Sequence, residues 1–389
     1  MKFSLKVQKL KLKLMKLPAI VSLLFIQASL LKGQDPLWVG TTDLSKNENI
    51  PFLKAEHSII DECTQGEYQF TLGADIVFHE GEFFTQWANS KEHENDAESL
   101  SRGRRSINGK TWGPREVIAS GFEGPGFHSS GVFHSEPGRL LTFNAEIQQQ
   151  KTRNGIFAGL RTDAFVYKPA TKKWEAQKVT GLEGFWPLCK PVRLANGKWI
   201  MAGAQNAPKT VLSAVAISDD NQLSRWRQVV IPHPSDLPPE QMWGETTITV
   251  EGTRVLAIVR NGKKGGTGFW HSISTDNGET WPELRESNIP HGGGRPVMGR
   301  LADGRHYLVA NMRTRNTLVL ALTQPGNFRF ERIYRLIDKP SPPVRMPSGA
   351  KRSQWGYPSA VEHNGRLYVV YSVTKEATGL TVVDLAKTR

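Results

Sequence analysis

Apolar and polar positions alternate in short runs along most of this chain. The β-branched run Thr246–Val250 is typical, since a turn at Gly252 and a second apolar run over Val255–Val259 follow it. Such runs, about four to eight residues long and bounded by Gly, Asn, Asp and Pro, are typical of strands and tight turns. No window shows the longer period of an amphipathic helix. The pattern therefore predicts an all-β protein.

One unit of strand, glycine turn and strand occurs six times. The turn glycines are Gly81, Gly138, Gly197, Gly252, Gly304 and Gly365. Neighbouring members of this series are 52 to 61 residues apart. A period in this range, with one hairpin per unit, is typical of a β-propeller, whose blades bury their faces only against neighbouring blades. Six hairpins therefore predict six blades.

The last strand that the pattern predicts, Leu380–Leu385, lies close to the end of the sequence. The sixth blade then lacks an outer strand, and an open ring would expose sheet edges. The apolar run Ser58–Ile60 precedes the first hairpin and is available to pair there. We therefore expect residues 55–61 to complete the blade formed by residues 357–386.

Residues 1–33 differ in composition from the rest of the chain. They hold seven lysines and no acidic residue, and they include the apolar run Leu17–Ile26. A positive segment before an apolar run too short to span a bilayer is typical of a secretory signal. Ala28 and Gly33 are both candidate cleavage points, and an uncleaved anchor is the alternative. We predict a signal peptide at 1–33, a propeller at 34–389, and a secreted or periplasmic protein.

The formal net charge of the whole chain is +13, and subtracting the seven lysines of the predicted signal leaves +6. A nucleic-acid-binding function therefore loses its main support. We predict a monomer that binds no nucleic acid and that is not inserted in a membrane once the signal is cleaved.

Signals for disulfides, metals and phosphates are weak. Cys63 and Cys189 fall in different predicted blades, so two free, buried thiols are expected in place of a disulfide. His93 and its neighbouring glutamates lack the spacing of a zinc site. Gly292–Gly294 is not followed by the Lys-Ser or Lys-Thr of a phosphate loop. We therefore expect no metal and no cofactor.

Two segments carry a recognisable turn motif. Residues 274–281 fit the Asp-box pattern Ser-x-Asp-x-Gly-x-Thr-Trp at every fixed position, and residues 106–112 are a shortened copy without the Asp. In such a turn the Ser and Asp side chains can accept hydrogen bonds from turn amides, Gly can take a positive φ, and Trp can pack between sheets. Both motifs are therefore expected to be structural.

With six aligned hairpins and these two motifs, the chain resembles the sialidase (neuraminidase) superfamily of Asp-box, or BNR-repeat, propellers. The resemblance covers nearly all of the sequence after residue 33 and implies a six-bladed β-propeller of sialidase type with Asp-box turns. Propellers with these motifs include hydrolases, lyases and binding proteins. The activity must therefore be inferred from the face of the ring where the inner strands begin.

Four residues near that face match the sialidase pattern, one of them with a neighbouring alternative. Glu245 opens an inner strand and Arg260 closes the same hairpin. Arg315 precedes an apolar strand, with Arg313 as its neighbouring candidate, and Tyr357 opens the last inner strand. The resemblance implies that Tyr357 attacks the anomeric carbon, that Glu245 acts as its base, and that the arginines bind the substrate carboxylate.

One arginine of the family pattern is missing. Sialidases open the first inner strand with an arginine that completes a carboxylate-binding triad, whereas residues 68–75 contain none. We expect Arg295 to substitute for it, and the alternatives are Arg102, Arg104 and Arg105.

The acid/base residue and a histidine complete the candidates. The loop 91–98 lies where the family keeps an aspartate, and Asp96 is preferred there over Glu94. His128 precedes another inner strand and is a candidate for substrate binding, although a hydrogen-bonded structural histidine is the more common case.

The leading hypothesis is an exported, retaining exo-glycosidase, resembling exo-α-sialidases, that hydrolyses a terminal acidic sugar from glycoconjugates. One alternative is a propeller hydrolase or lyase that acts on another acidic polysaccharide, with His128 and Tyr357 as base and acid. Another is a non-catalytic carbohydrate-binding propeller, which would keep the arginines but would not need Glu245 beside Tyr357.

Overall fold

The computed structural model describes residues 36–389, apart from 95, 97, 120–126, 153–154, 239–240, 264 and 348–350. The chain divides into two units, and the second, Leu37–Arg389, is compact and holds the strands of the fold. The signal peptide predicted at 1–33 lies outside the described residues.

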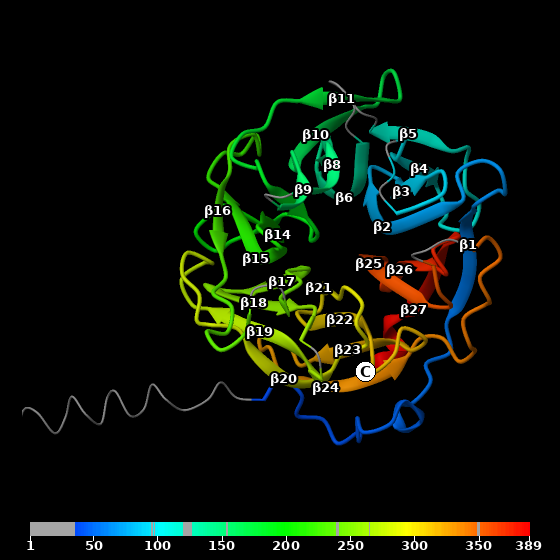
Figure 1. Ribbon diagram of the computed structural model, residues 1–389. Coiled ribbons are helices and arrows are strands. Elements are labelled where there is room, and N and C mark those ends of the chain that lie inside the picture. The colour runs from blue at the N-terminus through cyan, green and yellow to red at the C-terminus, as the bar shows by residue number, and fades with distance from the viewer. Residues whose placement is uncertain are drawn as a thin grey trace, which may run out of the picture. The chain divides into compact units, whose positions relative to one another are not determined.

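Within Leu37–Arg389, six antiparallel sheets stand around a common centre, and each contributes one blade (Figure 1). From the inner to the outer strand, blade one consists of β2 (Phe70–His79), β3 (Glu82–Ser90), β4 (Leu100–Ser106) and β5 (Glu116–Ala119). Blade two consists of β6 (Phe127–Glu136), β7 (Arg139–Ile147), β10 (Arg161–Lys168) and β11 (Lys173–Gln177). Blade three has β12 (Phe185–Pro187) and β13 (Val192–Arg193) as its inner strands, followed by β14 (Trp199–Ala207), β15 (Thr210–Ser218) and β16 (Arg227–Val230). Blade four consists of β17 (Thr246–Glu251), β18 (Arg254–Val259), β19 (Gly268–Ser274) and β20 (Arg285–Pro290). Blade five consists of β21 (Val297–Arg300), β22 (His306–Asn311), β23 (Leu318–Thr323) and β24 (Phe330–Arg335). Blade six consists of β25 (Trp355–His363), β26 (Arg366–Val373), β27 (Ala377–Asp384) and β1 (Glu56–Glu62). The predicted all-β, six-bladed propeller is confirmed.

Among the described residues, a hairpin and two 3₁₀ helices lie outside these sheets. The hairpin of β8 (Gln149–Thr152) and β9 (Gly155–Ala158) is inserted in blade two between β7 and β10. The 3₁₀ helices η1 (Asn47–Asn49) and η3 (Leu385–Thr388) lie before β1 and after β27. In the described part of the chain, no helix has both the length and the apolar composition needed to cross a membrane.

The ring closes through the strand that comes first in the sequence. β1 pairs antiparallel with β27, so that Ser58 lies opposite Leu380 and Glu62 lies opposite Ala377. The prediction that residues before the first hairpin complete the sixth blade is therefore confirmed. The pairing gives the outer backbone groups of β27 hydrogen-bond partners and joins the two ends of the propeller.

The core lies between neighbouring blades, and β23 shows how the sequence encodes it. Every residue of β23 is buried. Leu318, Leu320 and Leu322 pack in one cluster with residues of blade six, such as Val369. The alternate residues Val319 and Ala321 pack in another cluster with residues of blade four. A strand with a blade on each side is apolar at every position, because successive side chains point to opposite faces.

The turn at residues 274–281 is held by its own side chains. The Ser274 hydroxyl accepts a hydrogen bond from the Gly278 amide at 2.9 Å, and Asp276 accepts from the Thr280 amide at 3.0 Å and from its hydroxyl at 2.6 Å. Gly278 has a φ of 80°. The buried Trp281 packs among core residues of blades three and four. The turn therefore fastens two blades together and takes no part in a site.

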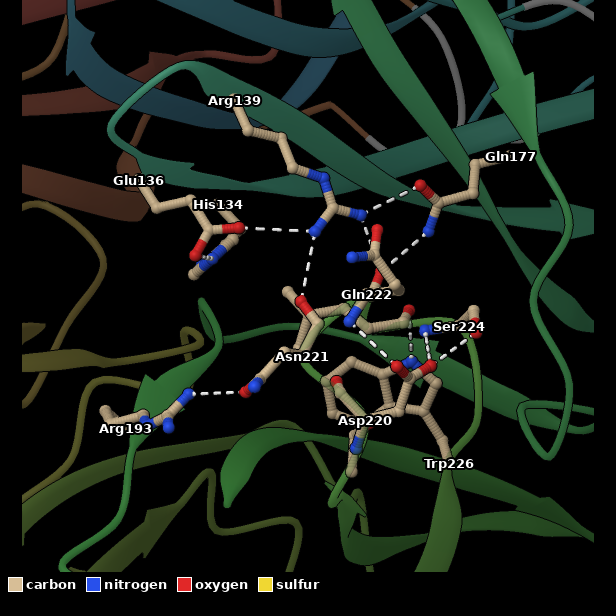
Figure 2. Close-up of polar contacts among 12 residues, drawn as sticks. His134, Glu136, Arg139, Gln177, Arg193, Asp220, Asn221, Gln222, Ser224 and Trp226 are labelled. Carbon is tan, nitrogen blue, oxygen red and sulfur yellow. Dashed lines mark hydrogen bonds and ion pairs between the residues drawn. The ribbon is translucent and has the colours of Figure 1, made fainter. Parts of the chain in front are cut away.

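A related turn in blade three has no glycine and was not predicted. Asp220 accepts hydrogen bonds from the amides of Gln222 and Ser224, and Trp226 donates to the Leu223 carbonyl at 2.9 Å (Figure 2). Leu223 has a φ of 54°, which a β-carbon disfavours. The sequence pattern missed this turn because leucine stands at the left-handed position.

This turn is tied to the preceding blade by one arginine. Arg139, at the start of β7, donates to the carbonyls of Asn221 at 3.2 Å and Gln222 at 2.6 Å (Figure 2). It also pairs with Glu136 at 3.2 Å. The outer turns thus connect neighbouring blades.

A buried ion pair crosses the axis of the ring. The Lys190 ammonium from blade three lies 3.2 Å from the Asp75 carboxylate of blade one and donates to the Ala360 carbonyl of blade six at 2.9 Å. Asp75 also accepts hydrogen bonds from the Phe133 amide of blade two at 2.7 Å and from the Ser359 hydroxyl of blade six. Four blades therefore meet at one carboxylate.

We expect Lys190→Met to destabilise the fold, because it leaves the Asp75 charge buried without its cation. Loss of one partner of a buried ion pair costs about 3–5 kcal/mol, and the partial exposure of Lys190 favours the lower end. Urea denaturation measures the change. The double variant Lys190→Met with Asp75→Asn should recover part of the loss. A single-variant loss below about 1 kcal/mol would show that the pair does not stabilise the axis.

Both cysteines are buried and free. Burial, and next the negative charge of Asp61, raise the pKa of Cys63 to about 12. The thiol is therefore protonated and unreactive at neutral pH.

Candidate active site

A pocket lies at the end of the axis where the inner strands begin. One wall is apolar and consists of Phe157, Trp186, Leu188, Ala204, Val211 and Trp243. The remaining lining residues are Leu72, Gly73, Glu94, Ser130, Glu245, Arg260, Arg295 and Tyr357. All six blades contribute, because the inner strands converge at this end. The pocket therefore places ionisable groups opposite an apolar surface, as ligand sites commonly do.

Glu245 and Arg260 form an ion pair within one hairpin. They flank β17 and β18, and Arg260 Nη1 lies 2.7 Å from Glu245 Oε2. The Arg260 amide also donates to the Glu245 carbonyl at 3.0 Å. Burial acts to raise the pKa of Glu245, but the charge of Arg260, followed by those of Arg295 and Arg315, outweighs it and holds the pKa below the usual value. Glu245 is therefore ionised at neutral pH.

The lowered pKa of Glu245 predicts how stability depends on pH. Because the folded-state pKa is depressed, the stabilisation is present above the ordinary value of 4.5 and is lost as the pH falls through the lower folded value. We expect the difference in unfolding free energy between wild type and Glu245→Gln to be constant from neutral pH to about 4.5 and to shrink below it. Denaturation at a series of pH values measures this. A difference independent of pH would mean that the pKa of Glu245 is the same in the folded and the unfolded protein.

Tyr357 lines the same pocket in a strained conformation. Its φ is 57°, at an irregularity in β25 between Gly356 and Ser359. Its hydroxyl accepts a hydrogen bond from Arg315 Nη1 at 3.1 Å. Arg315 is itself held by the Gly293 carbonyl at 2.6 Å. A left-handed conformation at a bulky residue is costly, and such strain is concentrated at functional sites.

No hydrogen bond joins Glu245 to the Tyr357 hydroxyl among the described contacts, although both residues line the pocket. The charges of both residues act on the Arg260 guanidinium. Burial acts to lower the pKa of Arg260, but the negative charge of Glu245, and next that of an ionised Tyr357, raise it. In this state Glu245 is therefore bonded to arginine, and proton transfer from Tyr357 needs a water or a shift of Arg260.

Arg295 is the arginine most available to a ligand. Its side chain is only 5% exposed, and no described residue forms a hydrogen bond or a close ion pair with its guanidinium. A β-carbon on Gly73 would lie 3.7 Å from Arg295 Nη2 and 2.4 Å from the Ser130 β-carbon. Blade one therefore has no room for a side chain at Gly73, and blade five supplies the guanidinium there.

In the loop 91–98, the structure brings Glu94 to the pocket but not Asp96. The Asp96 carboxylate accepts hydrogen bonds from the amides of Glu92 at 3.0 Å and His93 at 3.3 Å. Glu94 lines the pocket and lies 2.7 Å from the Lys375 ammonium. Asp96 thus holds the loop, and Glu94 is the carboxylate that faces the site.

Two further candidates lie away from the pocket. Arg313 is exposed and donates to the Leu44 carbonyl at 2.8 Å. His128 is fully buried, and its Nε2 lies 3.0 Å from Asp163 Oδ2. Their adjacency to inner-strand ends was therefore not sufficient to place them in the site.

The three arginines of blade one are also engaged elsewhere. Arg102 lies 3.8 Å from the ring centre of Tyr68. Arg104 pairs with Asp61 at 2.8 Å, and Arg105 pairs with Glu116 at 3.0 Å on the outer part of the blade. None of these alternatives lines the pocket, whereas Arg295 does.

One group of possible metal ligands is present in blade two. Ligand atoms of His128, Glu146 and Asp163 all lie within 4.8 Å of one another. Arg161 pairs with Glu146 and lies 3.1 Å from Asp163 Oδ1. Because one guanidinium already pairs with both carboxylates, the group fits a buried ion-pair network better than a metal centre.

The sequence interpretation missed part of the pocket wall. Phe157 lies in β9, within an insertion that has no counterpart in the other blades. Ser130 lies in the irregular segment of β6 between His128 and Gly131. Neither position follows from the hairpin repeat.

The family of BNR repeat-like domains matches residues 81–369. This match covers most of the chain, which therefore belongs to that family. Its six-bladed propeller is of the sialidase superfamily type. No curated protein sequence matches the chain.

Solved structures share the fold at low sequence identity. A protein of unknown function from Dyadobacter fermentans has a TM-score of 0.66 and 17% identity, over 86% of this chain and 100% of that chain. The Hadza microbial sialidase Hz136 has a TM-score of 0.66 and 9% identity, over 85% of this chain and 68% of that one. The NanB sialidase from Streptococcus pneumoniae has a TM-score of 0.59 and 10% identity, over 85% and 71%. At these identities the likeness shows the fold alone.

Proposed function

We propose that this protein is an exported glycoside hydrolase that removes a terminal acidic sugar from glycoconjugates. The observation that carries the proposal is the buried guanidinium of Arg295, which has no close partner among the described residues and lies in the same pocket as Tyr357 and Glu245. A buried cation without a close partner is costly and is best explained by a ligand that supplies the negative charge. A sugar carboxylate fits a planar guanidinium in bidentate fashion.

The charges around the pocket support an anionic substrate. The cations are Arg260, Arg295, Arg315 and Lys375, and the carboxylates are Glu94 and Glu245. Four positive and at most two negative charges leave an excess of at least two positive charges. This excess attracts an acidic sugar into the pocket.

The proposed chemistry assigns a role to the tyrosine, to one arginine and to both glutamates of the site. Tyr357 attacks the anomeric carbon, and the nearby guanidinium of Arg315 stabilises negative charge on its oxygen. Glu245 takes the phenolic proton, through a water or after Arg260 moves. Glu94, in place of Asp96, first takes up a proton from solvent, donates it to the leaving oxygen, and as the resulting carboxylate activates water. A phenol is a suitable nucleophile for an anomeric carbon that bears a carboxylate. Because the phenol is neutral until it is activated, the substrate carboxylate does not repel it.

A panel of fluorogenic sialosides and uronic-acid polysaccharides, assayed with protein lacking residues 1–33, tests the proposal. Hydrolysis of an acidic exo-glycoside with retention at the anomeric carbon is expected. Elimination from a uronic-acid polymer would favour a lyase, for which His128 would have to act as base despite its contact with Asp163. Binding without turnover would favour a carbohydrate-binding propeller.

A further inference from the structure

The loop between β20 and β21 contains three successive glycines, Gly292–Gly294. A β-carbon on Gly292 would lie 2.7 Å from the Thr314 carbonyl oxygen, so packing against blade five excludes a side chain there. Gly293 has a φ of 74°, which a β-carbon disfavours. Because a glycine backbone loses the most conformational freedom on folding, such a loop needs contacts from outside the run to fix it.

This loop reaches the candidate site through one carbonyl group. The Gly293 carbonyl accepts a hydrogen bond from Arg315 Nη2 at 2.6 Å. Arg315 Nη1 donates to the Gln354 side-chain oxygen at 2.9 Å and to the Tyr357 hydroxyl at 3.1 Å. Gly293 and Gln354 both offer neutral oxygens, so they hold the guanidinium without neutralising the charge that acts on the phenol. Gly293 thus holds one edge of the guanidinium, and Gln354 holds the other.

The imidazole of His291 in turn fixes Gly293. The Gly293 amide donates to His291 Nδ1 at 3.1 Å, and it makes no other hydrogen bond to a residue that the structure describes. His291 Nε2 lies 3.0 Å from the Gly266 carbonyl oxygen. An amide N–H can only donate and a carbonyl can only accept, so these two partners fit the neutral ring that carries its proton on Nε2. The His291 amide also donates to the Thr267 carbonyl at 3.0 Å. Both the ring and the backbone of His291 are therefore tied to blade four.

We propose that His291 is a positioning residue, which in its Nε2-protonated form orients Gly293 and, through the Gly293 carbonyl, the Arg315 guanidinium toward Tyr357. The consequence for catalysis rests on the function proposed above, in which Arg315 stabilises negative charge on the Tyr357 oxygen. Without the Nδ1 acceptor, the Gly293 backbone can rotate and turn its carbonyl away. Gln354 alone then holds the guanidinium, so the loss of activity is partial.

Two variants test the contact without substrate. His291→Leu removes both ring nitrogens. His291→Asn keeps an acceptor, because an Asn side-chain oxygen can bond to the amide two residues further on in an Asx turn. In a crystal structure of His291→Leu, Arg315 Nη2 should lie more than about 3.5 Å from the Gly293 carbonyl oxygen, whereas His291→Asn should keep the bond. An unchanged contact in His291→Leu would overturn the proposal.

The tautomer of His291 can be measured in the wild-type protein. Long-range ¹H–¹⁵N NMR of protein labelled with ¹⁵N-histidine, at about pH 8, distinguishes a proton on Nε2 from one on Nδ1. The signal of His291 is the one that disappears in His291→Asn. We expect the proton on Nε2. A proton on Nδ1 would leave the Gly293 amide without its acceptor and would overturn the proposal, even if His291→Leu does not fold.

Kinetics then test the effect on the reaction. One neutral hydrogen bond is lost, so kcat of His291→Leu on an acidic glycoside should fall about threefold to tenfold. His291→Asn should stay within about twofold of wild type. His271→Leu is the matched control, because His271 is a buried histidine of the same blade whose Nδ1 lies 3.0 Å from the Arg285 carbonyl, and its loss should leave kcat unchanged.

Two kinetic results would contradict the assigned role. One is wild-type kcat in a folded His291→Leu variant, and the other is an equal loss in His291→Leu and His291→Asn. A thermal transition close to that of wild type confirms that a variant is folded. If the wild type hydrolyses no acidic glycoside, the proposed function fails, and the crystal structures and the tautomer alone decide whether His291 positions Arg315.

Discussion

Tyr357→Phe should abolish turnover while it leaves the protein folded and able to bind its ligand. The change removes one oxygen, which the proposed chemistry uses as the nucleophile. We expect kcat to fall at least about a thousandfold, because loss of a nucleophile leaves only the contribution of binding and charge stabilisation. The binding constant of an acidic sugar should change little, since Arg260, Arg295 and Arg315 remain.

Tyr371→Phe is the matched control for this experiment. Tyr371 lies in the same blade, and its buried hydroxyl bonds to Thr381 at 3.0 Å, away from the pocket. Loss of that hydrogen bond should cost about 1 kcal/mol of stability and leave kcat unchanged. Wild-type kcat in Tyr357→Phe would exclude the phenol as nucleophile, and an equal loss in both variants would indicate a fold effect.

Arg295→Met should weaken substrate use without weakening the fold. A charge-assisted hydrogen bond contributes about 1.5–3 kcal/mol, so kcat/KM should fall roughly tenfold to a hundredfold. The free energy of unfolding should change by less than about 1 kcal/mol, because Arg295 makes no hydrogen bond to a described residue and the cost of burying its charge offsets its attraction to Glu245.

Arg305→Met serves as the control, because we expect it to lower stability and to leave substrate use unchanged. Arg305 is also buried, but it pairs with Asp303 at 2.8 Å and donates to the Thr388 carbonyl at 3.0 Å. Its loss should lower stability and leave kcat/KM unchanged. If Arg295→Met keeps wild-type kcat/KM on acidic glycosides, Arg295 does not bind the substrate carboxylate.

The ring was predictable because its signals are local and repeated. Each turn glycine marks one hairpin, and the absence of an outer strand after Leu385 required a partner such as β1. Hairpin geometry and the family resemblance together placed Glu245, Arg260 and Tyr357 near the axis, where the structure has them. At Gly73 of blade one, Ser130 leaves no room for a side chain and the Arg295 guanidinium lies nearby, so the substitution of Arg295 for the missing arginine stays a prediction.

The direction of side chains in loops could not be predicted in the same way. Asp96 and Glu94 are two residues apart, and no period determines which one faces the pocket. His128 lies at the right edge of its blade, but its ring bonds to Asp163 of a neighbouring strand. The turn around Leu223 was missed because leucine adopts a conformation that the pattern reserves for glycine.

Trapping the sugar on the enzyme tests the central claim most directly. An acidic glycosyl fluoride with a second fluorine beside the anomeric carbon slows breakdown of a covalent intermediate, since fluorine destabilises the positive charge of the second transition state. Mass spectrometry of the digested protein should find one added sugar on the peptide that contains Tyr357, and none in Tyr357→Phe. Turnover of acidic glycosides without such an adduct, or with the sugar on another residue, would contradict the account.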